Sequence, residues 1–135
     1  MKKIAIIGAG ISGLFIANLF KKNSNYQISI YEKNNSINLD RGYGIQLSVN
    51  SVKLLNKIGF YKFKDEKKFN PDKINFYSIK STKKICDLDI SYFNSKDCKY
   101  TTLKRSDLIN FLNKDVKDLI KPVSYTHLRA HETLH

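Results

Sequence analysis

Residues 3–13 read KIAIIGAGISG, and the next apolar stretch, residues 27–32, reads QISIYE. Residues 3–7 form a short run rich in β-branched residues, which is typical of a strand buried on both faces. A glycine-rich turn follows, and then a helix is predicted from about Ser12 to Lys22. A second strand is predicted over residues 27–31. The N-terminal quarter of the chain therefore predicts a compact β-turn-α-β unit.

Residues 8–13 read GAGISG, a G-x-G-x-x-G motif that follows a strand and opens a helix. Gly8 permits the tight turn, Gly10 lets the backbone approach a pyrophosphate, and Gly13 allows the helix to pack closely on the sheet. Glu32 lies 19 residues after Gly13, at a strand end, where it would accept hydrogen bonds from adenosine ribose hydroxyls. A carboxylate there disfavours the 2′-phosphate of NADP. We expect an α/β, Rossmann-like dinucleotide-binding fold.

The rest of the chain predicts a mixture of short strands and helices. We expect the following segments: an extended piece at residues 44–47, a helix from residues 48–50 to Gly59, a Lys-rich connector at 61–72, hairpin strands at 73–80 and 84–90, a strand at Thr101–Lys104, and a helix from the capping residue Ser106 to about Leu119.

The formal net charge of +12 needs a cause, because such charge often marks nucleic-acid binding. Lys, Asn and Ile together make up 50 of the first 122 residues, and these three share A/T-rich codons. Codon composition therefore explains the charge, and we expect no nucleic-acid partner. Nucleic-acid binding remains an alternative for residues 61–84, because this stretch contains eight Lys, three acidic residues and interleaved aromatic residues. The purely structural interpretation is a solvated connector followed by a hairpin whose aromatic side chains are core.

Two cysteines in 135 residues favour a reducing, cytoplasmic setting. The uncharged stretch from Ile4 to Phe20 is shorter than the ~20 residues that a membrane span needs. Three glycines within it weaken a signal-peptide interpretation. We expect no membrane span.

Residues 123–135, VSYTHLRAHETLH, contain no Lys, Asn or Ile. Within this stretch, residues 123–133 resemble a translated sequencing adapter, so we expect residues 123–135 to be an artefactual tail. Within it, residues 131–135 match the zinc motif H-E-x-x-H. A zinc site of this kind needs a third ligand, usually downstream, and none follows His135. We therefore expect no metal site.

Two further stretches carry a family resemblance. From Arg41 the chain reads RGYGIQLSVNSVKLLNKIGF, and from Leu103 it reads LKRSDLINFL. With the N-terminal motif, these resemble the class A FAD-dependent monooxygenases, the group of salicylate, p-hydroxybenzoate and ubiquinone-pathway hydroxylases. The resemblance spans residues 2–120.

The resemblance implies which residues bind the cofactor. Gly8, Gly10, Ser12 and Gly13 would lie against the FAD pyrophosphate, and Glu32 would bind its adenosine ribose. Two arginines, Arg41 and Arg105, would also lie near the FAD. The alternative is that both are solvated loop arginines. No catalytic residue is identifiable.

The resemblance also implies the activity of a longer protein. NAD(P)H would reduce FAD, O2 would form a flavin C4a-hydroperoxide, and an aromatic or isoprenoid-like substrate would be hydroxylated. Residues 1–70 and 100–122 would belong to an incomplete FAD-binding domain, and residues 71–99 would be the first strands of a substrate-domain sheet. We expect this part alone to be inactive. A related flavoprotein that does not hydroxylate, reductase-like or halogenase-like, remains an alternative, and the oligomeric state is open.

Overall fold

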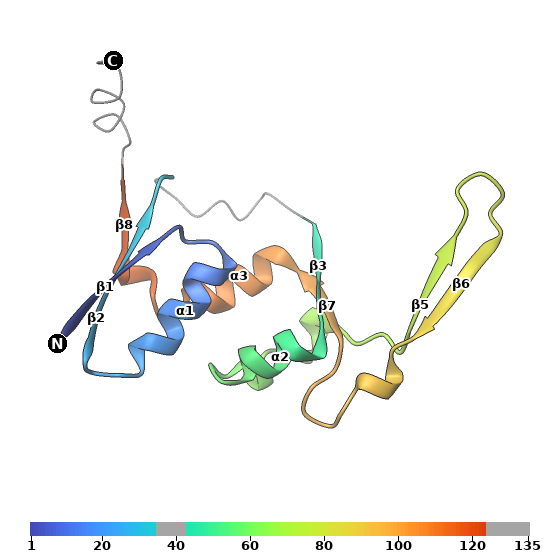
Figure 1. The fold of residues 1–135 in the computed structure, drawn as a ribbon, viewed down its shortest axis with the longest axis horizontal. Helices are drawn as coiled ribbons and strands as arrows, with labels where there is room; N and C mark the ends of the chain where they lie inside the picture. Colours follow the sequence, from blue (N-terminus) through green and yellow to red (C-terminus); the bar gives the residue numbers. More distant parts are fainter. Residues whose placement is uncertain (35–42, 124–135) are drawn as a thin grey trace, which may run out of the picture. The chain divides into compact units, whose positions relative to one another are not determined.

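The computed structural model describes residues 1–34 and 43–123. The chain divides into two compact units, the first formed by residues 1–42 and 108–135 and the second by residues 43–107. Both units combine helices with strands, so the predicted α/β class is confirmed (Figure 1).

The first unit is built on a three-stranded parallel sheet with the strand order β1-β2-β8. Its strands and first helix are β1 (Lys2–Ile7), α1 (Ile11–Lys21), β2 (Tyr26–Glu32) and β8 (Ile120–Pro122). Ile4 pairs with Ile28 and Ile6 with Ile30, so the aliphatic side chains of both strands share one face. The predicted β-turn-α-β unit is confirmed. The pairing of β8 with β2 was not predicted.

The core of the first unit lies between one face of this sheet and two helices. Ile28 and Ile30 are buried on the sheet, and Leu14 and Ala17 are buried on α1. The second helix, α3 (Arg105–Asn113), lies beside α1 in Figure 1. The Asn18 Nδ2 joins the two helices, because it donates to the carbonyls of Leu14 at 2.8 Å and Leu112 at 2.7 Å. The other buried residues of this core are Leu108, Ile109, Leu112 and Val116.

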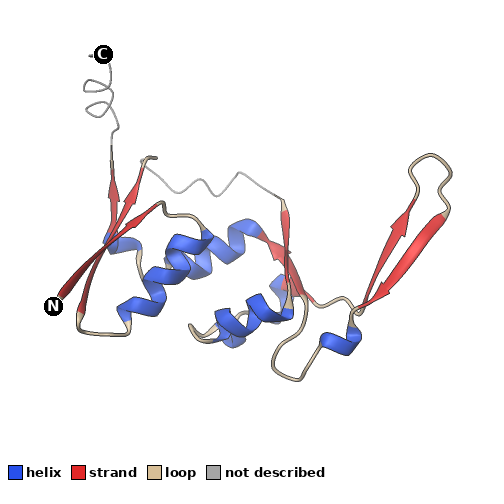
Figure 2. Cartoon of the chain, in the orientation of Figure 1, coloured by secondary structure: helices blue, strands red, loops and turns tan. Residues whose placement is uncertain are grey.

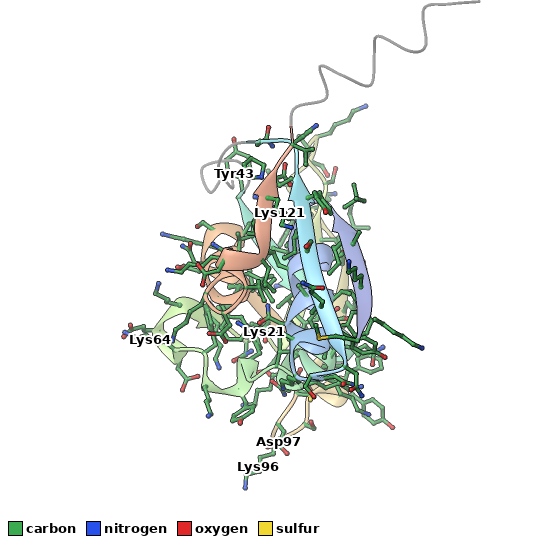
Figure 3. All side chains as sticks on the ribbon, turned by 90° about the vertical axis from the view of Figure 1, so that its left-hand side faces the viewer. Lys21, Tyr43, Lys64, Lys96, Asp97 and Lys121 are labelled. Carbon is green, nitrogen blue, oxygen red and sulfur yellow. The ribbon has the colours of Figure 1, made fainter. Side chains whose placement is uncertain are left out.

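The opposite face of the same sheet is open. Along β1 the exposed residues Lys3, Ala5 and Ile7 alternate with half-buried isoleucines, and Ile7 is 72% exposed. Figure 3 looks onto this face, where β8 with its labelled Lys121 lies in front of the helices. The prediction that residues 3–7 are buried on both faces is therefore wrong for the described residues. The reason is that both helices cover the same side.

We expect Leu14→Ala to lower the free energy of unfolding by about 2–5 kcal/mol, because Leu14 is fully buried and the cavity cannot fill from solvent. Urea unfolding followed by circular dichroism measures the change. Ile16→Ala on the same helix is the matched control, since Ile16 is 37% exposed and should cost clearly less. Equal losses in the two variants would contradict the assigned helix face.

The second unit contains a three-stranded antiparallel sheet with the order β3-β7-β4. Its elements are β3 (Gly44–Leu47), α2 (Val49–Asn56), the 3₁₀ turns η1 (Phe60–Lys62) and η2 (Asp65–Lys67), β4 (Lys68–Phe69) and β7 (Thr101–Lys104). Helix α2 begins within the predicted range of residues 48–50, and Ser48 caps it by accepting from the Ser51 N–H. The helix ends at Asn56, earlier than predicted, and Gly59 supplies a left-handed residue (φ +94°) that leads into η1.

A hairpin of β5 (Lys73–Tyr77) and β6 (Lys84–Asp89) follows in the second unit, as predicted (Figure 2). The pairs Ile74 with Leu88 and Phe76 with Cys86 place apolar side chains on one face. Phe76 and Leu88 are each 47% exposed, so the prediction that the hairpin aromatics are core is wrong for the described residues. A two-stranded hairpin has no layer of its own to cover such a face. Its assignment to a substrate domain stays a prediction.

The last predicted helix is shorter than expected. Helix α3 begins at Arg105, not after a cap at Ser106, and ends at Asn113. A polar turn follows, in which the Val116 N–H donates to the Asn113 carbonyl, and then η4 (Lys117–Leu119) leads into β8. Val116 continues the apolar spacing of the helix and is buried, although it lies in this turn. The spacing alone therefore predicted a longer helix than the one observed. The remaining short element is η3 (Ser91–Phe93).

Candidate nucleotide-binding site

The glycine turn joins β1 to α1. Gly8 has φ +95°, a backbone conformation that residues other than glycine rarely adopt. Its N–H donates to the Tyr31 carbonyl at 2.7 Å. Gly10 is the N-cap of α1, and no side chain caps this end among the described residues. The first N–H groups of any helix have no intrahelical acceptor, so here neither the helix nor a capping side chain in the described part of the chain supplies one. The positive end of the helix dipole also lies at this point. This arrangement suits an anion such as a phosphate.

The second and third glycines of the motif, Gly10 and Gly13, have different roles. A Cβ on Gly13 would lie 2.0 Å from the Gly8 carbonyl oxygen and 3.3 Å from the Ile6 Cγ2, so α1 packs there against the turn and β1. A Cβ on Gly10 would meet nothing within 4 Å. The packing of the described residues thus explains the glycine at position 13 and leaves the glycine at position 10 without a packing reason. A ligand that approaches the backbone closely would supply one.

Glu32 lies beside the turn at the end of β2. Its Oε2 accepts from the Ala9 N–H at 2.8 Å, and its Oε1 accepts from the backbone N–H and Nδ2 of Asn34, each at 3.1 Å. The bond from the Ala9 N–H lowers the pKa of Glu32 most, followed by those from the backbone N–H groups of Asn34 and Lys33 and by the charge of Lys33, so this pKa lies below its ordinary value of 4.5. The side chain is therefore an ionised acceptor at neutral pH.

This lowered pKa has a consequence for stability. Because the folded state favours the ionised form, Glu32 contributes stability above pH 4.5 that is lost as the pH falls through its folded pKa. We expect Glu32→Gln to lower the free energy of unfolding by about 1 kcal/mol at pH 7, since the group is partly solvated. The difference from the parent chain should shrink as the pH falls below 4.5. A difference that is independent of pH, measured by urea unfolding, would contradict this account.

The remaining predicted site residues are Ser12, Arg105 and Arg41. Ser12 is exposed in the first turn of α1. Arg105 is the first residue of α3, in the second unit, and its backbone N–H donates to the Tyr43 carbonyl at 3.1 Å. Arg41 lies outside the described residues. The structure therefore brings the glycine turn and Glu32 together, and the cofactor contacts of all seven residues stay predictions.

Asp107 lies in the first turn of α3, where its negative charge interacts favourably with the helix dipole. Its Oδ1 also accepts from the Lys67 Nζ at 2.7 Å. Both partners belong to the second unit. Asp107 therefore has a structural role at this helix end.

Two residues of the site were not singled out from the sequence, namely Ala9 and Asn34. The signal for Asn34 was present, because an Asn just after a strand end readily forms local hydrogen bonds. Nothing in the residue type marks Ala9, whose backbone N–H depends on the path of the turn.

A separate pocket of about 280 Å³ lies in the second unit and contains none of the predicted site residues. Val52 and Phe60 line it together with Lys68, Lys96 and other polar residues. Its Asn56 Oδ1 has no hydrogen-bond partner among the described residues, but this atom is covered from solvent and so does not face the pocket space. The pocket therefore gives no indication of a ligand.

Residues 1–34 and 43–123 hold no group of three side chains able to ligate a metal ion, and the zinc motif at 131–135 lies outside them. Within the same ranges, no helix has the length and apolar character required to cross a membrane.

A family model for an NAD(P)-binding Rossmann-like domain matches residues 6–40, a segment that contains both the glycine turn and Glu32. No curated protein matches the chain in sequence.

Solved structures match most of the chain. A variant of HpxO from Klebsiella pneumoniae, solved with FAD, is 19% identical with a TM-score of 0.72, covering 90% of this chain and 31% of that one. 2,6-Dihydroxypyridine-3-hydroxylase from Arthrobacter nicotinovorans is 17% identical with a TM-score of 0.61, covering 83% and 26%. A salicylate hydroxylase substrate complex is 18% identical with a TM-score of 0.65, covering 90% and 28%.

These likenesses show the fold. The chain has a Rossmann-like α/β fold, as predicted, and shares it with hydroxylases of the kind that the sequence resembles. It spans less than a third of the length of the three solved chains.

Proposed function

We propose that this chain is the nucleotide-binding N-terminal part of an FAD-dependent monooxygenase. The observation that carries the proposal is the open backbone at Gly10, at the uncapped start of α1, with the ionised Glu32 beside it. A pyrophosphate needs the first feature and an adenosine ribose needs the second. The fold shared with FAD-dependent hydroxylases supports the same conclusion.

The residues present fit the adenosine half of FAD. The free N–H groups at the start of α1 would hold the pyrophosphate, and the side chain of Ser12 lies in the same turn. A carboxylate oxygen has two lone pairs, and the Oε2 of Glu32, which accepts from Ala9, would offer its second lone pair as an acceptor position. That position suits a ribose hydroxyl. A 2′-phosphate would be repelled, which disfavours NADP here.

FAD is favoured over NAD for two reasons. The stretches from Arg41 and from Leu103 resemble those of the FAD-dependent family, and HpxO from Klebsiella pneumoniae was solved with FAD. Arg41 and Arg105 would add contacts to the cofactor, and both are arginine in a chain with 21 lysines. A guanidinium offers a planar fork of donors that an ammonium lacks.

The complete protein would use NAD(P)H and O2 to hydroxylate a small aromatic or similar substrate. FAD, when bound, supplies the redox chemistry, while the protein binds and orients it. A structure of HpxO holds FAD together with uric acid, and other matched structures are aromatic hydroxylases. We further propose a cytoplasmic setting, which the low number of cysteines supports.

The test is to sequence the source DNA across the codon for Pro122 and to express the whole open reading frame found there. We expect the frame to continue and the protein to co-purify with yellow absorbance from a bound flavin. Substrate-dependent NAD(P)H oxidation with hydroxylated product would establish the reaction. A colourless intact protein that also fails to bind added FAD would overturn the proposal.

A further inference from the structure

The carboxylate of Glu32 connects two segments that are far apart in sequence. Its Oε2 accepts from Ala9 in the glycine turn, and its Oε1 accepts twice from Asn34, which follows β2. The residue before Glu32 also takes part, since the Tyr31 carbonyl accepts from the Gly8 N–H at 2.7 Å. Both Gly8 and Ala9 are thus tied to the end of β2.

Such ties matter for a turn rich in glycine. Fixing the backbone of one residue costs about 1–2 kcal/mol of conformational entropy, and glycine loses the most freedom on ordering. A turn that is already ordered before the ligand arrives binds it more tightly, because little further conformational entropy is lost when the ligand binds. Ala9 is 3% exposed, so its N–H lies inside the turn and is directed at Glu32 and not at solvent.

Asn34 determines how the carboxylate is turned. Two donors on one residue, its backbone N–H and its Nδ2, both meet the same oxygen, Oε1. This leaves the other oxygen, Oε2, directed at Ala9. Hydrogen bonds to an ionised group are stronger than neutral ones, so a pair of them can hold the carboxylate in one rotamer.

We propose that Asn34 is a positioning residue that acts through Glu32 to hold the glycine turn in its nucleotide-binding shape. The inference rests on the proposed function, because it assigns the turn to the nucleotide. Glu32 then has two roles: it orders the turn through Ala9, and it accepts a ribose hydroxyl at its remaining position. Asn34 itself touches no nucleotide in this account.

The experiment uses the 135-residue chain labelled with ¹⁵N and ¹³C, with ADP as the probe of the nucleotide site. The variants are Asn34→Ala, which removes one donor, and Asn34→Asp, which also places a second acid next to Glu32. The matched control is Asn23→Ala at the other end of β2, where Asn23 Oδ1 accepts from the Asn25 N–H at 3.0 Å, also two residues away.

Three quantities are measured by NMR: amide exchange at Ala9 without ligand, the pKa of the Glu32 carboxyl, and ADP affinity. We expect Asn34→Ala to speed Ala9 exchange and to weaken ADP binding, each by about three- to tenfold. The pKa of Glu32 should rise slightly, since the Nδ2 bond to its ionised form is lost while the backbone N–H bonds from Ala9 and Asn34, which lower this pKa, are retained. Asn34→Asp should exceed these effects, and Asn23→Ala should leave all three unchanged.

The outcomes separate the two claims. Unchanged Ala9 exchange and Glu32 pKa in both Asn34 variants would overturn the positioning role. The expected changes at Ala9 and Glu32 in a parent chain that ignores ADP would support the positioning of the turn while contradicting the proposed nucleotide site. An equal response to Asn23→Ala would assign the effect to general loosening of β2 and would also overturn the proposal.

Discussion

Replacing Gly13 by alanine is expected to destabilise the chain by about 2–4 kcal/mol, although the change adds a single methyl group. The new Cβ would lie 2.0 Å from the Gly8 carbonyl oxygen, which is less than the sum of the atomic radii. That oxygen belongs to the backbone and cannot swing away like a flexible side chain. Gly8 is also held by its bond to the Tyr31 carbonyl, so α1 itself must shift away from β1.

The measurement is urea unfolding of the 135-residue chain, with Gly10→Ala as the control. Gly10→Ala adds the same methyl group three residues earlier, where nothing lies within 4 Å. It should cost less than about 1 kcal/mol. Similar unfolding midpoints for the two variants would contradict the close contact between α1 and the turn.

Replacing Gly10 by valine is expected to have the opposite pattern, a loss of nucleotide binding with little loss of fold. The backbone at Gly10 has φ −79° and ψ −176°, an extended conformation that valine adopts readily. The branched side chain would occupy the space at the start of α1 where the phosphates are proposed to lie. Losing two charge-assisted hydrogen bonds there would weaken ADP or FAD binding by about a hundredfold or more.

Calorimetric titration with ADP measures the binding, and thermal unfolding checks the fold. The unfolding midpoint of Gly10→Val should stay close to that of the parent chain. The proposed site would be wrong if Gly10→Val bound ADP as tightly as the parent. It would also be wrong if Gly10→Val lost binding only in proportion to a loss of folded protein.

The sequence was sufficient to predict the β-turn-α-β unit, because its signals are local. The spacing of Gly8, Gly10 and Gly13 and the run of aliphatic residues in β1 each point to one conformation. The hairpin of β5 and β6 was predicted for the same reason. Its alternating pattern matches the observed register of Ile74 with Leu88 and Phe76 with Cys86.

The features that were missed depend on contacts between distant parts of the chain. Strand β8 has three residues, and it is a strand because Ile120 pairs with Ile30, ninety residues away. The early end of α3 at Asn113 reflects a turn that still buries Val116, so the apolar spacing alone could not separate the turn from more helix. The exposure of Ile7 depends on which face the helices cover, and strand composition does not report that.

The candidate site divides in the same way. The motif predicted the packing role of Gly13, and the close approach to Gly8 is observed. It also predicted an acid at the end of the second strand, and Glu32 lies next to the turn. The bond from Ala9 and the two from Asn34 could not be predicted, because they depend on the exact path of the backbone after β2.

The central claim is that the turn at residues 8–13 holds a dinucleotide, and a titration of the ¹⁵N-labelled chain with ADP tests it most directly. The account predicts shifts in the amides of Gly10, Ile11, Ser12 and Gly13 that saturate with ADP and are absent in Gly10→Val. The amides of the second-unit hairpin, β5 and β6, should not respond. Turn amides that stay unchanged at millimolar ADP, in a chain whose spectrum shows it to be folded, would contradict the claim.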